Sequence, residues 1–224
     1  MRKLMLRDML FAAAAAIGLA MGATPAHAGS VFQLGNNPQP NEENVLLTKG
    51  QTGNTVGGFT NQSNIPVDII STQTLLNSAG GQAQTNALSG PGGSTVPFTN
   101  FTIEIPNGTF TDLIFNPRIG GQPPVQNGTA DISVLANEPG GGTQTSTFTY
   151  SLGNGQNYLT ILASGGETMR SVSFTSTTGF NDLIDVRISG SAVVPEPLTI
   201  VMALEALVSL GVVMVRRRRR DASP

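Results

Sequence analysis

The chain has 224 residues, with 12 Lys and Arg against 14 Asp and Glu, one histidine and no cysteine. The histidine is His27, so residues 29–194 contain neither histidine nor cysteine, which excludes disulfides, Ser-His-Asp or Cys-His catalysis, and zinc sites of the usual ligands. The same span carries four basic and ten acidic residues, a net charge of minus six, which disfavours nucleic-acid binding.

The first 28 residues are organised like a secretory signal peptide. Arg2, Lys3 and Arg7 form a positive start, an Ala-rich apolar run follows, and Ala26 and Ala28 supply the small residues of a signal-peptidase site. We therefore expect a signal helix over residues 1–28, export from the cytoplasm and cleavage by signal peptidase after Ala28. Retention of the segment as an N-terminal anchor is the alternative.

Residues 29–44 are rich in Asn and Pro, a composition that favours an extended lead-in. Glu42 and Glu43 lie in this segment, and we expect them to be a solvated pair of charges. Residues 45–192 then supply enough chain for one domain with one hydrophobic core.

Residues 45–192 have the pattern of an all-β domain. Apolar and polar residues alternate in several short segments, and Asn107-Gly108 and Gly153-Asn154-Gly155 are turn signals that predict hairpins between the segments around them. We predict eight to ten strands in two packed antiparallel sheets, a jelly-roll-like β-sandwich, with an immunoglobulin-like sandwich as the second choice. The predicted strands are residues 45–48, 67–70, 84–88, 101–105, 109–115, 132–136, 148–152, 159–163, 172–174 and 184–188.

Three carboxylates are weak candidates for a calcium site, because hard oxygen ligands need neither cysteine nor histidine. They are Glu167, Asp182 and Asp185. Residues three apart on a strand point to opposite faces, so Asp182 and Asp185 could share an ion only at a loop or bulge. Solvated or cross-strand-paired carboxylates, with Arg187 as a partner, are the preferred interpretation, and we expect no metal or other cofactor.

Sugar binding and hydrolysis have little direct support in the residues. The chain has no Trp, and its tyrosines, Tyr150 and Tyr158, fall within strand patterns that favour a half-buried role over a sugar platform. A glycosidase needs two facing carboxylates in a cleft, and ten carboxylates always allow some pair. We therefore expect no enzymatic activity.

The C-terminal residues have the pattern of a sorting tail. Residues 193–197 contain Pro195, Glu196 and Pro197, and residues 198–215 form an apolar run that would span about 27 Å as a helix, close to the thickness of a bilayer core. We expect residues 198–215 to form a transmembrane helix that contacts membrane lipid. Arg216, Arg217, Arg218, Arg219 and Arg220 follow, within a basic tail over residues 216–224 that should stay cytoplasmic. Glu205 interrupts the apolar run and is unfavourable in a membrane.

Pro195-Glu196-Pro197, followed by an apolar segment and an arginine cluster on an exported chain, resembles the PEP-CTERM sorting signal of bacterial surface proteins. The resemblance implies that an exosortase, a membrane-embedded processing enzyme, recognises the motif and removes the tail. It also implies a location that is first the inner membrane and then the cell surface or extracellular matrix. Residues 155–161, 165–167, 179–183 and 186–189 are similar to ectodomains that carry this signal, a resemblance that implies a fold and a location but no activity.

Three functions remain compatible with the sequence. The first is a non-enzymatic surface or matrix protein with a structural or adhesive role, embedded in exopolysaccharide. The second is a carbohydrate- or calcium-binding β-sandwich module, which an exposed aromatic on a concave sheet or converging carboxylates would favour. The third is a secreted hydrolase, which requires a deep cleft.

Overall fold

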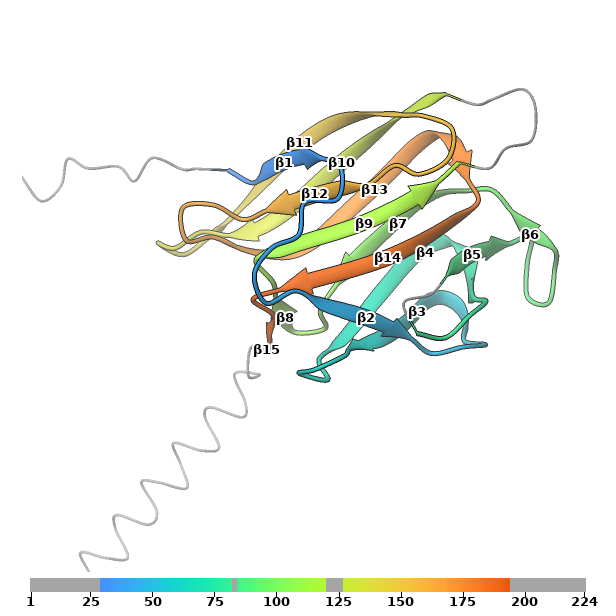
Figure 1. Cartoon of the computed structure of the whole chain (residues 1–224), viewed down its shortest axis with the longest axis horizontal. Coiled ribbons are helices and arrows are strands. Elements are labelled where there is room, and N and C mark those ends of the chain that lie inside the picture. The colour runs from blue at the N-terminus through green and yellow to red at the C-terminus, as the bar shows by residue number, and fades with distance from the viewer. Residues whose placement is uncertain (1–28, 82–83, 120–126, 194–224) are drawn as a thin grey trace, which may run out of the picture.

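A computed structural model describes residues 29–81, 84–119 and 127–193, and these residues form an antiparallel all-β domain (Figure 1). These residues include no helix that is long and apolar enough to cross a membrane. The expected signal peptide, the Pro-Glu-Pro motif, the apolar C-terminal segment and the arginine cluster lie outside the described residues. The strands are β1 (Val31–Leu34), β2 (Glu43–Leu47), β3 (Thr52–Thr60), β4 (Pro66–Asn77), β5 (Thr85–Leu88), β6 (Thr95–Val96), β7 (Phe98–Glu104), β8 (Gly108–Thr109), β9 (Asp112–Arg118), β10 (Gly128–Asn137), β11 (Thr143–Leu152), β12 (Leu159–Leu162), β13 (Thr168–Phe180), β14 (Asp182–Ser189) and β15 (Ala192–Val193).

The strands are arranged in two layers that one continuous sheet forms by folding over itself. The order of hydrogen-bonded strands is β1-β12-β9-β14-β2-β3-β4-β7-β13-β10-β11, and β5 pairs with both β14 and β4. In Figure 1 the front layer contains β1, β12, β9, β14 and β2, and the back layer contains β4, β7, β13, β10 and β11. The antiparallel all-β class predicted from the alternation is confirmed, whereas the finer description as a jelly roll stays a prediction.

A cluster of phenylalanines joins the two layers. Phe115 on β9 in the front layer contacts Phe101 and Phe174 in the back layer, with ring centroids 5.6 Å and 6.0 Å apart. Phe101 and Phe174 lie on neighbouring strands and stack on each other at 4.8 Å. All three side chains are almost completely buried, so each contributes a large apolar area and favourable ring geometry to the core.

Two glycines in β3 allow the sheet to pass from the front layer to the back layer. A Cβ atom on Gly58 would lie 2.2 Å from the carbonyl oxygen of Leu46 on β2, and one on Gly57 would lie 2.8 Å from that of Val67 on β4. Neither distance is possible for a real side chain. Residues without a Cβ are therefore required where β3 lies closely between its two neighbours.

The two predicted hairpins are wrong, although turns occur at both positions. Asn107 adopts a φ of 53° and Gly108 donates a backbone hydrogen bond to Ile105, so the chain does turn there. However, β7 pairs with β13 and β4, whereas β9 pairs with β12 and β14. Likewise β12 pairs with β1 and β9 and not with β11. Each turn carries the chain from the back layer to the front layer. The strands before and after it then face each other across the core and bury their apolar faces there.

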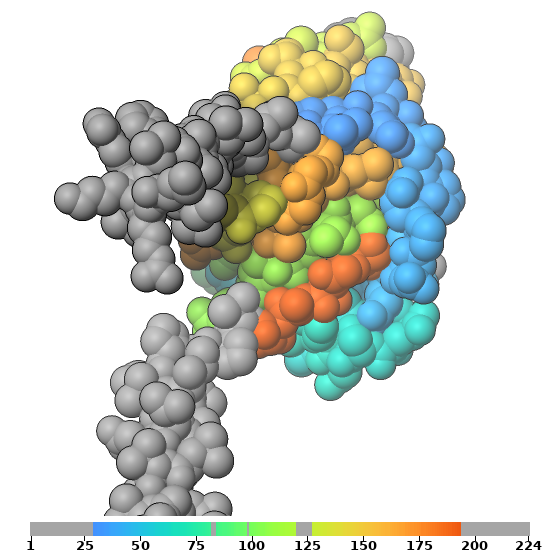
Figure 2. Space-filling view, turned by 90° about the vertical axis from the view of Figure 1, so that its left-hand side faces the viewer, coloured from blue at the N-terminus to red at the C-terminus, as the bar shows by residue number. Residues whose placement is uncertain are grey.

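Residues 29–44 are part of the sheet structure. They contain β1, which pairs with β12, and a connecting segment, residues 35–42, that leads into β2. Figure 2 shows this part of the chain, in blue, running along one side of the molecule. Glu42 accepts a hydrogen bond from Arg187 and its side chain is only 9% exposed, so the expectation of a solvated pair is wrong for Glu42. Glu43 accepts exposed hydrogen bonds from the backbone of Gln62 and Ser63.

The described residues contain fifteen strands, more than the eight to ten predicted. Three of the additional strands, β6, β8 and β15, are two residues long, which is too short for any alternation to be recognised. A fourth, β3, contains three glycines and little apolar alternation.

Candidate functional site

The outward face of the back layer is covered by hydroxyl groups. In β11 the alternate residues Thr143, Thr145, Thr147, Thr149 and Ser151 are all exposed, while Tyr150 and Leu152, on the opposite face of the strand, are buried. The same alternation in β10 and β13 directs Asp131, Ser133, Ser173 and Thr175 outward, away from the core. We call this surface the hydroxyl face and define it by Asn100, Thr102, Asp131, Ser133, Thr147, Thr149, Ser173 and Thr175.

The register of the strands aligns these residues in two rows across the sheet. Asp131 faces Thr149 on one side and Thr175 on the other, and Thr175 faces Asn100. In the second row the order is Thr147, Ser133, Ser173 and Thr102. Neighbouring strands lie about 4.8 Å apart and successive outward residues about 7 Å apart, so the side chains form a regular grid of polar groups.

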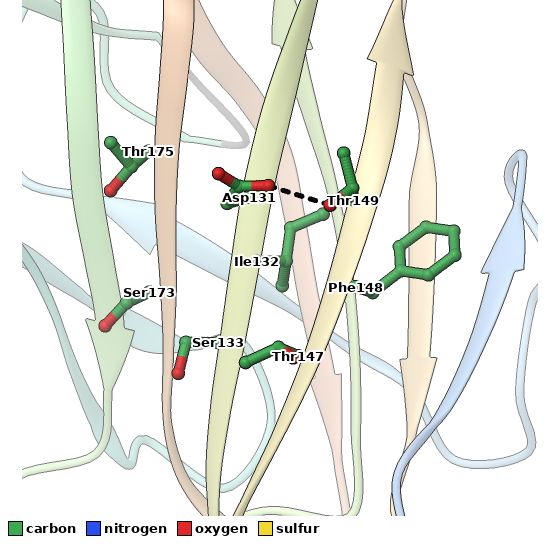
Figure 3. Close-up of a pocket in the computed structure, with 8 residues that line it drawn as sticks. All are labelled: Asp131, Ile132, Ser133, Thr147, Phe148, Thr149, Ser173 and Thr175. Carbon is green, nitrogen blue, oxygen red and sulfur yellow. Dashed lines mark hydrogen bonds between the residues drawn. The ribbon is translucent and has the colours of Figure 1, made fainter.

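A shallow depression of about 380 Å³ lies on this face (Figure 3). Asp131 lies in the row with Thr149 and Thr175, and the hydroxyl of Thr149 donates a hydrogen bond of 2.9 Å to the Asp131 carboxylate. The remaining lining comes from Ile132, Ser133, Thr147, Phe148, Ser173 and Thr175. Five hydroxyl groups from three strands therefore line the depression together with one carboxylate.

A network of hydrogen bonds fixes the side of the hydroxyl face nearest β4. Asn100 accepts hydrogen bonds from the hydroxyls of Ser71 and Thr72, and its amide nitrogen donates to the Thr72 hydroxyl at 2.8 Å. The hydroxyls of Thr102 and Ser173 are 2.9 Å apart and share a hydrogen bond. These contacts hold the side chains in place before a ligand arrives, which lowers the entropy lost on binding.

The chemistry of the depression fits a neutral ligand that is rich in hydroxyl groups. Each Thr or Ser hydroxyl both donates and accepts a hydrogen bond, and the Asp131 carboxylate accepts several. No basic residue lines the depression, so an anionic ligand would meet Asp131 without a compensating charge. The depression also lacks a free aromatic platform, because the Phe148 ring stacks on Phe32 with centroids 4.9 Å apart.

The three carboxylates considered for calcium have separate partners. Asp182 receives two hydrogen bonds from Arg118, at 2.6 Å and 2.5 Å, and a third from Gln84. Asp185 accepts a hydrogen bond from the Tyr158 hydroxyl at 2.5 Å, and Glu167 accepts one from Gln144. A strand irregularity does occur between Ile184 and Arg187, yet it does not bring the carboxylates together. No group of three or more possible metal ligands occurs in the part of the chain that the structure describes.

The preferred interpretation of Asp182 as a cross-strand-paired carboxylate agrees with this geometry, but its partner is different. Asp182 on β14 faces Arg118 on β9, whereas Arg187 binds Glu42. The tyrosines also have the half-buried roles that the strand pattern indicates, since Tyr150 is buried and Tyr158 donates to Asp185.

Asp112 is a buried carboxylate that sequence reasoning did not single out. It begins β9, is 4% exposed, and its Oδ1 atom has no hydrogen-bond partner. Burial, and after it the negative charge of Glu42, raise the pKa of Asp112 to about 7, while the Ser189 backbone and Arg187 act in the opposite direction. The group changes charge near neutral pH.

The hydroxyl face was also missed, although part of the signal is in the sequence. Threonine occupies every second position from 143 to 149, which predicts one hydroxyl-lined face of a strand. The position of Asp131 beside Thr149 depends on the register of β10 and β11, which single-strand alternation does not specify.

No protein-family model matches the chain, and no curated protein matches it. Among solved structures, the enzymatically active domain of tailspike protein 4 of bacteriophage CBA120 is 14% identical, with 73% of this chain and 19% of that chain covered and a TM-score of 0.24. The family 11 carbohydrate-binding module from Clostridium thermocellum, solved with a β-1,3-1,4-mixed-linked tetrasaccharide, is 9% identical, with 73% and 97% covered and a TM-score of 0.27. Neither score reaches 0.5, so neither comparison carries an argument about this chain.

Proposed function

We propose that the domain is a non-enzymatic carbohydrate-binding β-sandwich that contacts neutral polysaccharide through the hydroxyl face. The observation that carries the proposal is the grid of hydroxyls around Asp131 in an open depression. The separation of the rows, about 7 Å along each strand, allows neighbouring hydroxyls of a sugar ring to be bound by two residues at once. An open depression also suits a long chain, which can enter and leave at both ends.

The expected binding is weak for each sugar and relies on many contacts. Hydrogen bonds to sugar hydroxyls replace hydrogen bonds to water, so each contributes only about 0.5 to 1.5 kcal/mol, with a somewhat larger contribution from the charged Asp131. Affinity should therefore increase with the length of the oligosaccharide.

Affinity electrophoresis of the full chain in gels that contain neutral or acidic polysaccharides tests this proposal. We expect neutral polysaccharides to retard the protein, and we expect Asp131→Asn and Thr175→Val to weaken the retardation several-fold. Thr143→Val is the matched control, because Thr143 lies on the same strand face as Thr147 but does not line the depression. Equal retardation of all variants, or a preference for acidic polysaccharides, would contradict the proposal.

The proposed location rests on the ends of the chain. Signal peptidase would cleave after Ala28, and an exosortase would read Pro195-Glu196-Pro197 and release the domain from its anchor to the cell surface or matrix. Binding to exopolysaccharide would then keep the released domain in that matrix, which gives it a structural or adhesive role.

The sorting part is tested separately from binding. Changing Pro195, Glu196 and Pro197 to alanine should leave the protein in the inner membrane with its tail intact. Mass spectrometry of the mature C-terminus provides the measurement. Unchanged processing of the variant would show that the motif has no role, and would leave the carbohydrate proposal unaffected.

A further inference from the structure

The strand β11 is a long edge strand that carries no charge. It lies at one end of the strand order, and among the described residues β10 is its single ladder partner. Its ten residues contain no Lys, Arg, Asp, Glu or Pro. Soluble proteins normally protect long edges with such residues, because unpaired backbone groups are a template for another strand.

The backbone groups that β11 leaves free belong to its threonines. The backbone N–H of Thr129 on β10 donates to a hydroxyl of β13, and its carbonyl accepts from Ser176 and Thr177 of the same strand. Because the direction of the backbone N–H and C=O groups alternates along a strand, those of Ala130 and Ile132 point to β11. These two residues pair there with Tyr150 and Phe148. The intervening residues of β11 therefore direct their N–H and C=O groups away from β10; they are Thr143, Thr145, Thr147, Thr149 and Ser151.

These five residues are symmetric about Thr147, and we infer that β11 pairs antiparallel with β11 of a second copy of this chain. A two-fold axis at Thr147 places Thr145 opposite Thr149 of the second copy and Thr143 opposite Ser151. Each facing pair exchanges two backbone hydrogen bonds, about ten bonds in all. The axis is perpendicular to the sheet, so the two hydroxyl faces join into one continuous surface.

The charges near β11 permit this pairing of like with like. The nearest carboxylate on the hydroxyl face, Asp131, is one strand inside the edge and faces Thr149. In a dimer the two Asp131 residues are therefore three strand spacings apart across the sheet and four residues apart along the strands, roughly 20 Å in all. Screening at physiological salt removes most of their repulsion at that distance. A charged partner protein, by contrast, would find no residue of opposite charge on β11.

A second feature of the same edge of the domain, where β11 and β1 lie, also favours an interface. The front-layer edge strand β1 lies beside β11 in Figure 1, and the rings of Phe32 and Phe148 stack between them. Val31 and Leu34 on β1 are 43% and 65% exposed. Among the described residues, this edge of the domain therefore combines unpaired backbone groups with exposed apolar side chains, a combination typical of interfaces between subunits.

Disulfide cross-linking of the full chain tests the inference, because the chain contains no cysteine of its own. In Thr147→Cys the two introduced residues meet at the axis with Cα atoms about 5.5 Å apart, within the range for a disulfide. We expect mild oxidation to give a covalent dimer on a non-reducing gel. Ser133→Cys, on the same face but one strand inside, should give none. Equal dimer from both variants would overturn the inference.

The register has its own test. A mixture of Thr145→Cys and Thr149→Cys chains should cross-link at least tenfold more than either chain alone. Adding Thr147→Lys to both chains places two like charges at the axis and should reduce this yield at least tenfold, whereas Thr147→Val should retain it. An unchanged yield with Thr147→Lys, or efficient cross-linking through Val31→Cys in place of Thr147→Cys, would overturn the proposed pairing. None of these readouts depends on carbohydrate binding.

Discussion

The guanidinium group of Arg187 lies 2.9 Å from the carboxylate of Glu42, although 145 positions separate the two residues in the sequence. Arg187 is on β14, and Glu42 ends the connecting segment between β1 and β2. The side chains are only 16% and 9% exposed. Arg187 also donates to Asn36, and the backbone of Asn37 donates to Thr160 on β12. The connecting segment is therefore held against the front layer by several polar contacts, two of them partly buried.

Replacing Arg187 with glutamine should destabilise the domain by about 3 kcal/mol, because the Glu42 carboxylate is left largely buried without its partner. Denaturant unfolding followed by circular dichroism measures the change. Arg170→Gln is the matched control, because Arg170 is exposed on β13, and its effect should stay within about 0.5 kcal/mol. Similar losses for both variants would show that the Arg187–Glu42 pair is not a specific contribution to stability.

Asp112 should make the domain less stable as the pH rises from about 4 to about 7. The pKa of Asp112 is raised from 3.8 to about 7 in the folded protein, so the folded state binds more protons than the unfolded state between these values. Stability therefore falls through this window and is constant above it. At about 1.4 kcal/mol for each unit of pKa, the loss is on the order of 4 kcal/mol.

The variant Asp112→Asn isolates this effect, because asparagine does not ionise. The unfolding free energy of Asp112→Asn minus that of the natural chain should increase from pH 5 to pH 8, because only the natural chain loses stability in this range. Asp131→Asn, which removes an exposed carboxylate, provides the control and should leave the profile nearly unchanged. A difference that is the same at pH 5 and pH 8 would show that Asp112 does not titrate in this range.

The alternation of side chains predicts which segments become strands but not which strands become neighbours. Ile132, Val134 and Ala136 alternate with polar residues, and β10 forms there because one face of the strand is buried. The same local pattern is compatible with either layer of a sandwich. A turn does form at Asn107, where φ is 53°, yet the pairing of β7 with β13 depends on contacts between residues about 70 positions apart.

The candidate site was less predictable than the strands for the same reason. The threonines of β11 form a hydroxyl-lined strand by local rules alone, but the depression also requires Asp131 and Thr175 from two other strands. The partners of Asp182 and Glu42 likewise depend on register and on the path of residues 35–42. The strand pattern around the tyrosines does predict their half-buried role, because it depends on local alternation alone.

Phe101 should be among the most sensitive core positions, because its ring contacts those of Phe115, Phe174 and Phe180. Phe101→Ala leaves a large cavity between the layers and should cost about 3 to 5 kcal/mol in unfolding free energy. Phe59→Ala is the control, since the Phe59 side chain is 45% exposed and should contribute much less. Thermal unfolding of both variants distinguishes them, and a loss for Phe59→Ala as large as that for Phe101→Ala would contradict the assignment of the core.

The strand β3, where the sheet passes from the front layer to the back layer, should tolerate no side chain at Gly58. An added methyl group would lie 2.2 Å from the carbonyl oxygen of Leu46, so β2 and β3 would have to separate and weaken their ladder. We expect Gly58→Ala to lower the unfolding free energy by about 2 kcal/mol or more. Gly140→Ala is a matched control, because a Cβ atom there has nothing within 4 Å. Amide hydrogen exchange should show faster exchange in β2 and β3 of Gly58→Ala with β10 and β11 unaffected, whereas uniform protection in both variants would mean that β3 accommodates the methyl group.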